Sequence, residues 1–246
     1  MLRITSPNII SKSAAIHHID TVKKPVIFWD TCSFLDIIRL PIPERKQSAA
    51  VIGKVIEIKN KIVSKDIVSL SSVLCVREFN DHIENYVKMV ELASKNLSGS
   101  FNNFIDFINK IQLGATPIPS VDLSVYKLED QLCLIIHAII NETLFVSEED
   151  SFAQFAHFRT KNKIPPAKVK GEYKDCYIWG SCLELRQSSS DKSYPFYFLS
   201  SNVTDYGVKN SSDFVTEIKH EATINNITYF SNFNIAHGLL KRDRIL

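Results

Sequence analysis

One short segment constrains the fold of this chain more than any other. Val26–Trp29 is an uninterrupted apolar run, and Asp30 follows it at once. Strands that are buried on both faces have this appearance, and they belong to parallel sheets that helices cover. The segment therefore predicts a buried parallel strand with an acidic residue at its carboxyl end.

Three further segments are expected to be strands: Ile67–Leu70, Phe196–Leu199 and Ile227–Phe230. Segments with a helical spacing of apolar residues separate them. Strands that alternate with helices predict an α/β fold, in which a parallel sheet is covered on both faces. Helices are expected at 34–38, 44–62, 73–95, 101–113, 124–144, 147–158, 173–186, 213–219 and 234–240, with a break at 96–100 around Gly99.

The length of 246 residues suits one large α/β domain that carries a helical insertion. Residues 1–24 are polar and irregular, and we expect them to form an N-terminal arm. Residues 25–246 are expected to form a single domain. No strand is expected between about residues 80 and 165, which predicts an all-helical insertion packed against the sheet.

Composition excludes several classes of protein. The formal net charge is only +2, so nucleic acid could be gripped only by a local patch. No apolar stretch is long enough to span a bilayer, and the N-terminus lacks the apolar core of a signal peptide. Five cysteines without a CxxC pair argue against a disulfide framework or a zinc site. We therefore expect a cytoplasmic protein without a membrane partner.

A set of acidic and polar residues follows the predicted strands or begins a predicted helix. The carboxyl ends of parallel strands meet at one edge of a sheet, so these residues are expected to converge there. Carboxylate oxygens are the ligands that Mg²⁺ prefers, and a divalent cation activates water for phosphodiester hydrolysis. Each residue alone is also explained as a helix cap or turn former, so the prediction depends on their convergence. The set is Asp30, Glu78, Asp175, Asn202 and Asp205.

The motifs around these residues resemble those of PIN-domain nucleases. They are VIFWDTCSFLDIIR (26–39), SLSSVLCVREFNDH (69–82), IPPAKVKGEYKDCYIWGSCLEL (164–185) and FYFLSSNVTDYG (196–207). The resemblance covers roughly residues 25–210, and the nearest subgroup is the larger PIN-like proteins of the DUF4935 type. It implies a three-layer α/β/α sandwich around a parallel sheet, a Mg²⁺ or Mn²⁺ site and endoribonuclease activity.

The matched positions imply that Asp30, Glu78 and Asp175 are metal ligands and catalytic residues. The fourth motif departs from the usual pattern, because Asn202 stands where many PIN domains have Asp. Its amide oxygen could still bind a metal, and Asp205 is expected to supply the missing charge to the metal and catalytic set. Two serines beside these motifs, Ser33 and Ser201, are expected to support the site.

A basic segment at residues 159–174 overlaps the start of the third motif, and its prolines predict an extended loop. Six cations against one acid favour binding to a phosphate backbone, although a solvated charged loop explains the pattern equally well. The proposed nucleic-acid-binding residues are Arg159, Lys161, Lys163, Lys168, Lys170 and Lys174.

Several functions remain open at this level. The first is a metal-dependent ribonuclease of a toxin-like or defence type, which would have RNA as substrate and a protein inhibitor as partner. The alternatives are a structure-specific DNA nuclease, with single-stranded DNA as another substrate, and a catalytically silent PIN-like module that binds nucleic acid. A thiolate phosphatase is disfavoured because the glycine and arginine that cradle phosphate are missing after Cys32. The oligomeric state does not follow from the sequence.

Overall fold

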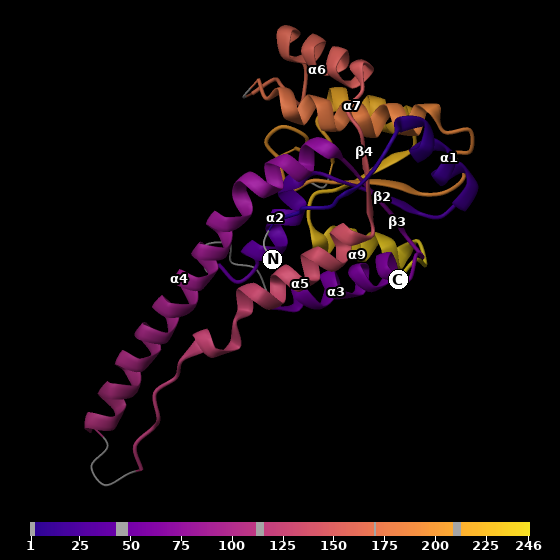
Figure 1. Ribbon diagram of the computed structural model, residues 1–246. Coiled ribbons are helices and arrows are strands. Elements are labelled where there is room, and N and C mark those ends of the chain that lie inside the picture. The colour runs from indigo at the N-terminus through magenta and orange to yellow at the C-terminus, as the bar shows by residue number, and fades with distance from the viewer. Residues whose placement is uncertain (1–2, 43–48, 112–115, 170, 209–212) are drawn as a thin grey trace.

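The computed structural model describes residues 3–42, 49–111, 116–169, 171–208 and 213–246 (Figure 1). In this part of the chain, six strands form one sheet in the order β1-β4-β3-β2-β5-β6, and every pairing is parallel. The predicted α/β fold with a parallel sheet is therefore confirmed. The strands are β1 (Asn8–Ile10), β2 (Val26–Trp29), β3 (Val68–Ser72), β4 (Thr143–Val146), β5 (Phe196–Leu199) and β6 (Ile227–Phe230).

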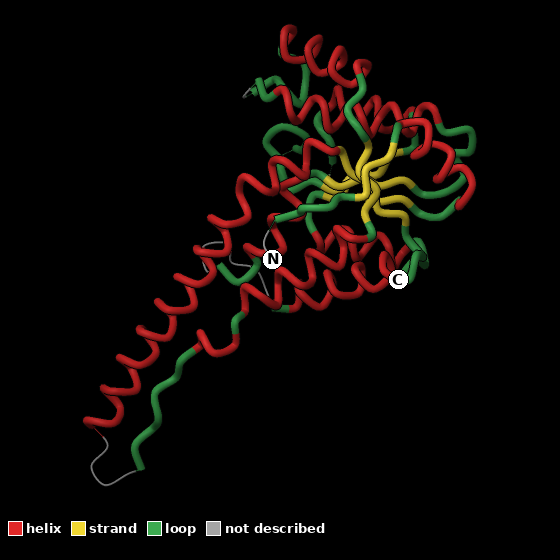
Figure 2. The backbone as a smooth tube through the Cα atoms, in the orientation of Figure 1, coloured by secondary structure: helices red, strands yellow, loops and turns green. Residues whose placement is uncertain are grey.

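Helices lie on both faces of the twisted sheet (Figures 1 and 2). On one face lie α3, α5 and α9, and on the other lie α1 and α7. The helices are α1 (Lys12–Val22), α2 (Thr31–Arg39), α3 (Ala50–Val63), α4 (Val73–Ile111), the 3₁₀ helix η2 (Leu123–Tyr126), α5 (Leu128–Asn141), α6 (Asp150–Asn162), α7 (Tyr173–Ser188), α8 (Thr216–Ile224) and α9 (Phe233–Arg242).

Strand β2 is buried on both faces, as its apolar sequence predicts. Ile27 and Trp29 belong to the core under α3, α5 and α9, whereas Val26 and Phe28 belong to the core under α1 and α7. Successive side chains of a strand point to opposite faces, so an unbroken apolar run is required wherever both faces are covered.

The order of the strands creates a switch point beside β2. From β2 the chain continues to β3 on one side, and after β4 it crosses over to β5 on the other side. Trp29 is in register with Ser71 of β3 and with Leu199 of β5, so these three strands end together. Ligands of open α/β sheets bind beyond the strand ends at such a point. The fold therefore brings the residues that follow β2, β3 and β5 to one place.

The predicted N-terminal arm is wrong, because residues in this stretch form an edge strand and a helix. Strand β1 pairs with β4, and Ser11 caps α1 by accepting a 3.2 Å hydrogen bond from the Ala14 amide. The strand is short and the helix buries only Ala15 and Ile19, so both lack a strong apolar pattern. A serine cap followed by two apolar residues four apart was the available signal.

The predicted all-helical stretch 80–165 contains a strand. Strand β4 lies between β1 and β3, and the hydroxyls of Thr143 and Ser69 are joined by a 2.7 Å hydrogen bond. The single helix expected at 124–144 is replaced by η2, α5 and this strand, with Lys127 left-handed (φ 43°) between the two helices. The apolar run of α5 leads almost directly into the strand, so the change of period is hidden in the sequence.

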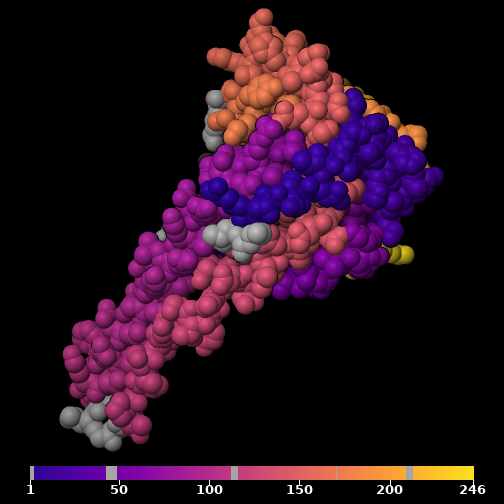
Figure 3. Space-filling view, in the orientation of Figure 1, coloured from indigo at the N-terminus to yellow at the C-terminus, as the bar shows by residue number. Residues whose placement is uncertain are grey.

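The break predicted at 96–100 is also wrong. Helix α4 continues without interruption over 39 residues and projects far from the sheet (Figures 1 and 3). Gly99 lowers helix propensity, but packing against a neighbouring segment readily overrides propensity. The segment 116–122 returns along α4 and supplies that packing.

The return segment is held by two asparagines of α4. Asn102 exchanges two hydrogen bonds with the backbone of Val121 (2.7 and 2.9 Å), and Asn109 does the same with Ile118 (2.8 and 2.9 Å). Seven helical residues rise about 10.5 Å, and three extended residues span about 10 Å. The spacing of the two asparagines therefore matches the extended chain opposite them.

In the ranges described here, no helix is long and apolar enough to cross a membrane.

Candidate active site

Asp30 lies at the carboxyl end of β2, where it is 3% exposed. Its Oδ1 accepts a 2.7 Å hydrogen bond from the Thr31 amide and so caps α2. Its Oδ2 accepts bonds from the hydroxyl of Ser200 (2.6 Å) and from the thiol of Cys32 (3.0 Å). Asp30 is therefore a buried carboxylate held in one orientation by neutral donors.

Glu78 lies in the second turn of α4 and faces the same place. Its Oε2 accepts a 2.7 Å hydrogen bond from the hydroxyl of Thr31, the residue whose amide binds Asp30. Thr31 therefore links the two carboxylates, which come from separate elements. Helix α4 begins directly after β3, so Glu78 lies near the edge of the sheet where the strands end.

Asp175 lies in the first turn of α7, as predicted. Its Oδ2 accepts a 3.1 Å hydrogen bond from the side-chain amide of Asn202. Tyr206 is fully buried, and its hydroxyl donates a 2.8 Å hydrogen bond to the backbone carbonyl of Asp175. The loop after β5 thus fixes both the side chain and the backbone of this residue.

Asp205 has the most unusual environment of the set. It is 3% exposed, and neither of its carboxylate oxygens has a hydrogen-bond partner in the part of the chain that the structure describes. A buried charge without a partner is costly. A bound cation would supply the missing partner.

Mutual repulsion links the four acidic residues. Burial is the main cause that raises the pKa of Asp175 well above its usual range, and the negative charges of Asp30, Asp205 and Glu78 raise it further. Burial also raises the pKa of Asp30, against the hydrogen bonds from Cys32 and Ser200, and Glu78 adds to the rise. The charges of Asp30, Asp205 and Glu78 thus act on Asp175, whereas the convergence of these residues on one metal ion stays a prediction.

The two serines expected to support the site have other partners. Ser33 donates a 3.0 Å hydrogen bond to the carbonyl of Leu199, and this bond ties α2 to β5. Ser201 contributes its amide, which donates to the sulfur of Cys32 at 3.2 Å. The side chains that donate to the carboxylates are instead those of Thr31, Cys32, Ser200 and Asn202. The register of β2 with β5 places Ser200 opposite Asp30.

The donor set suits a hard divalent cation. The negative charges of Asp30, Asp205 and Glu78 act on Asp175, and positive charge would relieve this repulsion. Among the described residues, the oxygens of Asp205 have no hydrogen-bond partner. In the described ranges, however, no group of three or more His, Cys, Asp or Glu side chains has an arrangement that could hold a metal ion. Glu78 and Asp175 each accept a hydrogen bond with a single carboxylate oxygen, from Thr31 and Asn202 respectively.

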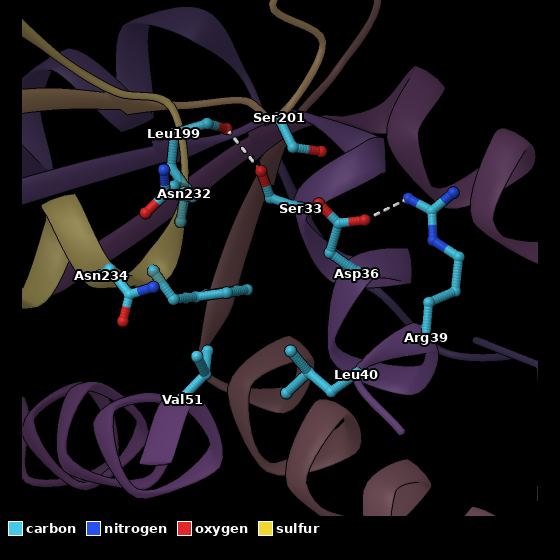
Figure 4. A pocket seen from close by; sticks show the side chains of 10 residues that line it. Ser33, Asp36, Arg39, Leu40, Val51, Leu199, Ser201, Asn232 and Asn234 are labelled. Atoms are coloured by element: carbon cyan, nitrogen blue, oxygen red, sulfur yellow. Dashed lines mark hydrogen bonds and ion pairs between the residues drawn. The ribbon is translucent and has the colours of Figure 1, made fainter. Parts of the chain in front are cut away.

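A small cavity of about 40 Å³ lies beyond the carboxyl end of β5, between α2, α3 and the start of α9 (Figure 4). Its lining is partly apolar and includes none of the four acidic residues. Ser33 and Ser201 line it near the strand ends, and the ion pair of Asp36 with Arg39 lines it on α2. Arg39 also stacks on the ring of Tyr86, with 4.7 Å from the guanidinium carbon to the ring centroid. The cavity has room for a few water molecules but not for a nucleotide.

The basic segment differs in part from its prediction. Helix α6 extends to Asn162, and Arg159 is 4% exposed, with its guanidinium bonded to Glu221 and to the carbonyl of Pro165. Arg159 is therefore a buried structural cation that cannot reach a phosphate backbone. Lys170 lies outside the described residues. The other proposed cations are exposed, namely Lys161, Lys163, Lys168 and Lys174.

Aromatic side chains accompany the exposed lysines. Phe158 is 60% exposed near the end of α6, and Tyr173 is 40% exposed two residues before Asp175. Exposed rings interleaved with cations suit single-stranded nucleic acid, because bases stack on the rings and phosphates bind the cations. This surface leads directly into the first turn of α7, where Asp175 lies.

No protein-family model, no curated protein sequence and no solved structure matches this chain.

Proposed function

We propose that this chain is a Mg²⁺- or Mn²⁺-dependent endonuclease that hydrolyses phosphodiester bonds, with single-stranded RNA as its substrate. The observation that carries the proposal is the mutually repelling set of Asp30, Glu78, Asp175 and Asp205 at the switch point of the sheet, of which Asp30 and Asp205 are buried. The motifs that resemble PIN-domain nucleases supply the same four residues.

The roles of the residues follow from their contacts. Asp30, Glu78, Asp175 and Asp205 would hold the cation, which supplies Lewis-acid activation of water and neutralises charge on the phosphate. Ser200 and Thr31 donate hydrogen bonds that hold the Asp30 carboxylate in one orientation. The lysines on 161–174 would bind the phosphate backbone on the side of Asp175.

Cleavage of labelled RNA and of DNA with the same sequence tests the proposal. Mn²⁺ or Mg²⁺ should be required, EDTA should stop the reaction, and added metal should restore it. Asp30→Asn should lower the rate by more than the roughly 10–100-fold loss typical of residues that only orient metal ligands. Asp81→Asn is the matched control, because Asp81 is exposed on α4 one turn beyond Glu78. A rate unchanged by EDTA or by Asp30→Asn would refute the proposal.

A second candidate function is a module that binds nucleic acid and does not cut it. It is favoured by Asn202, which brings a hydrogen-bond donor rather than a negative charge to Asp175. This candidate predicts RNA binding that persists in EDTA and no cleavage with any divalent cation. Binding and cleavage measured on the same labelled RNA separate the two functions.

A further inference from the structure

The arm formed by α4 and the return segment 116–122 stands clear of the sheet and its helices (Figures 1 and 3). Its inner side is used, because Asn102 and Asn109 bind the return segment and Ser98 accepts a 3.0 Å hydrogen bond from the Leu123 amide. The rest of the helix surface in this outer half faces away from the return segment.

A row of apolar side chains runs along one outer flank of α4. Leu97, Phe101, Phe104 and Ile111 are 53–74% exposed, and Ile108 between them is partly exposed. We call these five residues the arm stripe. Their separations are four, three, four and three residues, which is the seven-residue repeat that keeps one seam facing a partner helix.

The arm stripe is comparable to the largest apolar patches of ordinary monomers, and such patches are often functional. Aromatic side chains carry about 150–250 Å² each, and the other stripe residues add to this. With Phe107 beside it, 68% exposed, the stripe offers on the order of 500 Å² of apolar surface. Two such stripes in contact would cover about 1,000 Å² in total, which reaches the lower bound for a specific dimer.

The charged residues of the arm lie away from the arm stripe, so they do not prevent it from packing against an identical stripe. Successive helix residues are 100° apart, and on this geometry Lys95, Asp106 and Lys110 lie on roughly the opposite flank. Small neutral residues, Ser94 and Ser100, border the stripe instead. Like charges therefore do not oppose self-pairing, and a two-fold dimer places the same surface on both sides.

We propose that the arm stripe is a dimerisation surface, and that its occupant is the same stripe of a second copy of this chain. The two outer halves of α4 pack as a short two-helix coiled coil, with Phe101 and Phe104 at its centre. An interface of this size is typical of transient association, so we expect the dimer to form and separate with concentration. The dimer needs no nuclease activity.

Sedimentation velocity of the full-length protein over a concentration series tests the proposal. The wild type should pass from monomer to dimer, and Phe104→Glu should raise the dissociation constant at least about 30-fold, as expected for a central interface residue. Asn103→Glu is the matched control, because it adds the same charge to an exposed neighbour about 100° around the helix and should leave the dimer intact. Phe101→Glu should act like Phe104→Glu. Circular dichroism should show all variants folded, since these side chains are exposed.

Three results would overturn the proposal. The first is a wild type that stays monomeric throughout the series, and the second is a Phe104→Glu variant that dimerises as tightly as the wild type. The third is a monomer that sediments with phospholipid vesicles, which would assign the stripe to a lipid surface instead.

Discussion

The side-chain amide of Asn202 donates a 3.1 Å hydrogen bond to Oδ2 of Asp175. This asparagine therefore brings a neutral donor to Asp175, at the position where the resemblance to PIN domains implies a further carboxylate. Two substitutions of the pair, one at each residue, test how the site balances its charges.

Asn202→Asp should destabilise the metal-free protein and strengthen metal binding. It replaces a donor with a negative charge next to Asp175, so the unfolding free energy should fall by roughly 1–2 kcal/mol and the melting temperature by about 2–8 °C. Mn²⁺ should then raise the melting temperature more than it does in the wild type. Asn202→Ala, which loses the hydrogen bond without adding charge, separates the two causes in a thermal-shift series with Mn²⁺. An equal Mn²⁺ response in all three proteins would argue against a cation at this site.

Asp175→Asn should stabilise the metal-free protein. Burial and the neighbouring acids raise the pKa of Asp175, so removing its charge relieves repulsion. Each pKa unit corresponds to about 1.4 kcal/mol, and one unit would raise the melting temperature by about 3–6 °C. The stabilising effect of Mn²⁺ should disappear in the same variant. Calorimetry at neutral pH, with and without Mn²⁺, measures both effects, and a lower melting temperature without metal would contradict the electrostatic account.

Asn102→Ala should release the return segment of the arm. Two hydrogen bonds to Val121 are lost, each contributing about 0.5–1.5 kcal/mol, while the core around the sheet is untouched. Hydrogen exchange should become faster at residues 118–123, with little change in the strands. Asn103→Ala, at an exposed neighbouring position, is the control and should leave exchange unchanged. Equal protection in both variants would show that the asparagine spacing does not hold this segment.

Stability at acidic pH should depend on Asp20. Partial burial opposes ionisation of Asp20, but hydrogen bonds from Ser189 and Ser190 outweigh it and lower its pKa from 3.8 to about 2. A group with a depressed folded-state pKa stabilises the protein above its unfolded pKa, and the effect is lost as the pH falls through the folded value. The stability difference between wild type and Asp20→Asn should therefore be constant above about pH 4 and shrink between pH 4 and pH 2. Chemical denaturation across this range measures it, and a constant difference would refute the assignment.

The exposed lysines before α7 should set the salt dependence of RNA binding. Each phosphate neutralised on a single strand contributes a slope of about −0.7 in log affinity against log salt. Replacing three of these lysines by Ala should therefore flatten the slope by up to about 2 units. The three are Lys161, Lys163 and Lys168. An equal number of exposed lysines on α4 provides the control, namely Lys88, Lys95 and Lys110. An identical slope in both triple variants would show that this segment does not contact RNA.

The sequence alone determined three strands and the acidic residues that lie near the strand ends. The bounds predicted for β2, β5 and β6 are those observed. Strands β2 and β5 are apolar throughout because both of their faces are covered. Parallel strands end at a common edge, so residues directly after them were expected to converge, and Asp30 and Asp175 do influence each other. Both inferences use information carried by single short segments.

Only the tertiary structure decided which strands pair and which polar side chains contact one another. Strand β4 was hidden because its apolar residues continue those of α5, and it became a strand by pairing with β3 and β1. Arg159 was expected on the surface, but it is buried and forms an ion pair with Glu221, which lies 62 residues away in the sequence. Asn202 was expected to present an oxygen to a metal, but in the fold its amide faces Asp175. The position of a buried polar side chain depends on the partner with which it forms hydrogen bonds. Strand register and helix packing bring together partners that are distant in the sequence, and a local sequence pattern does not reveal them.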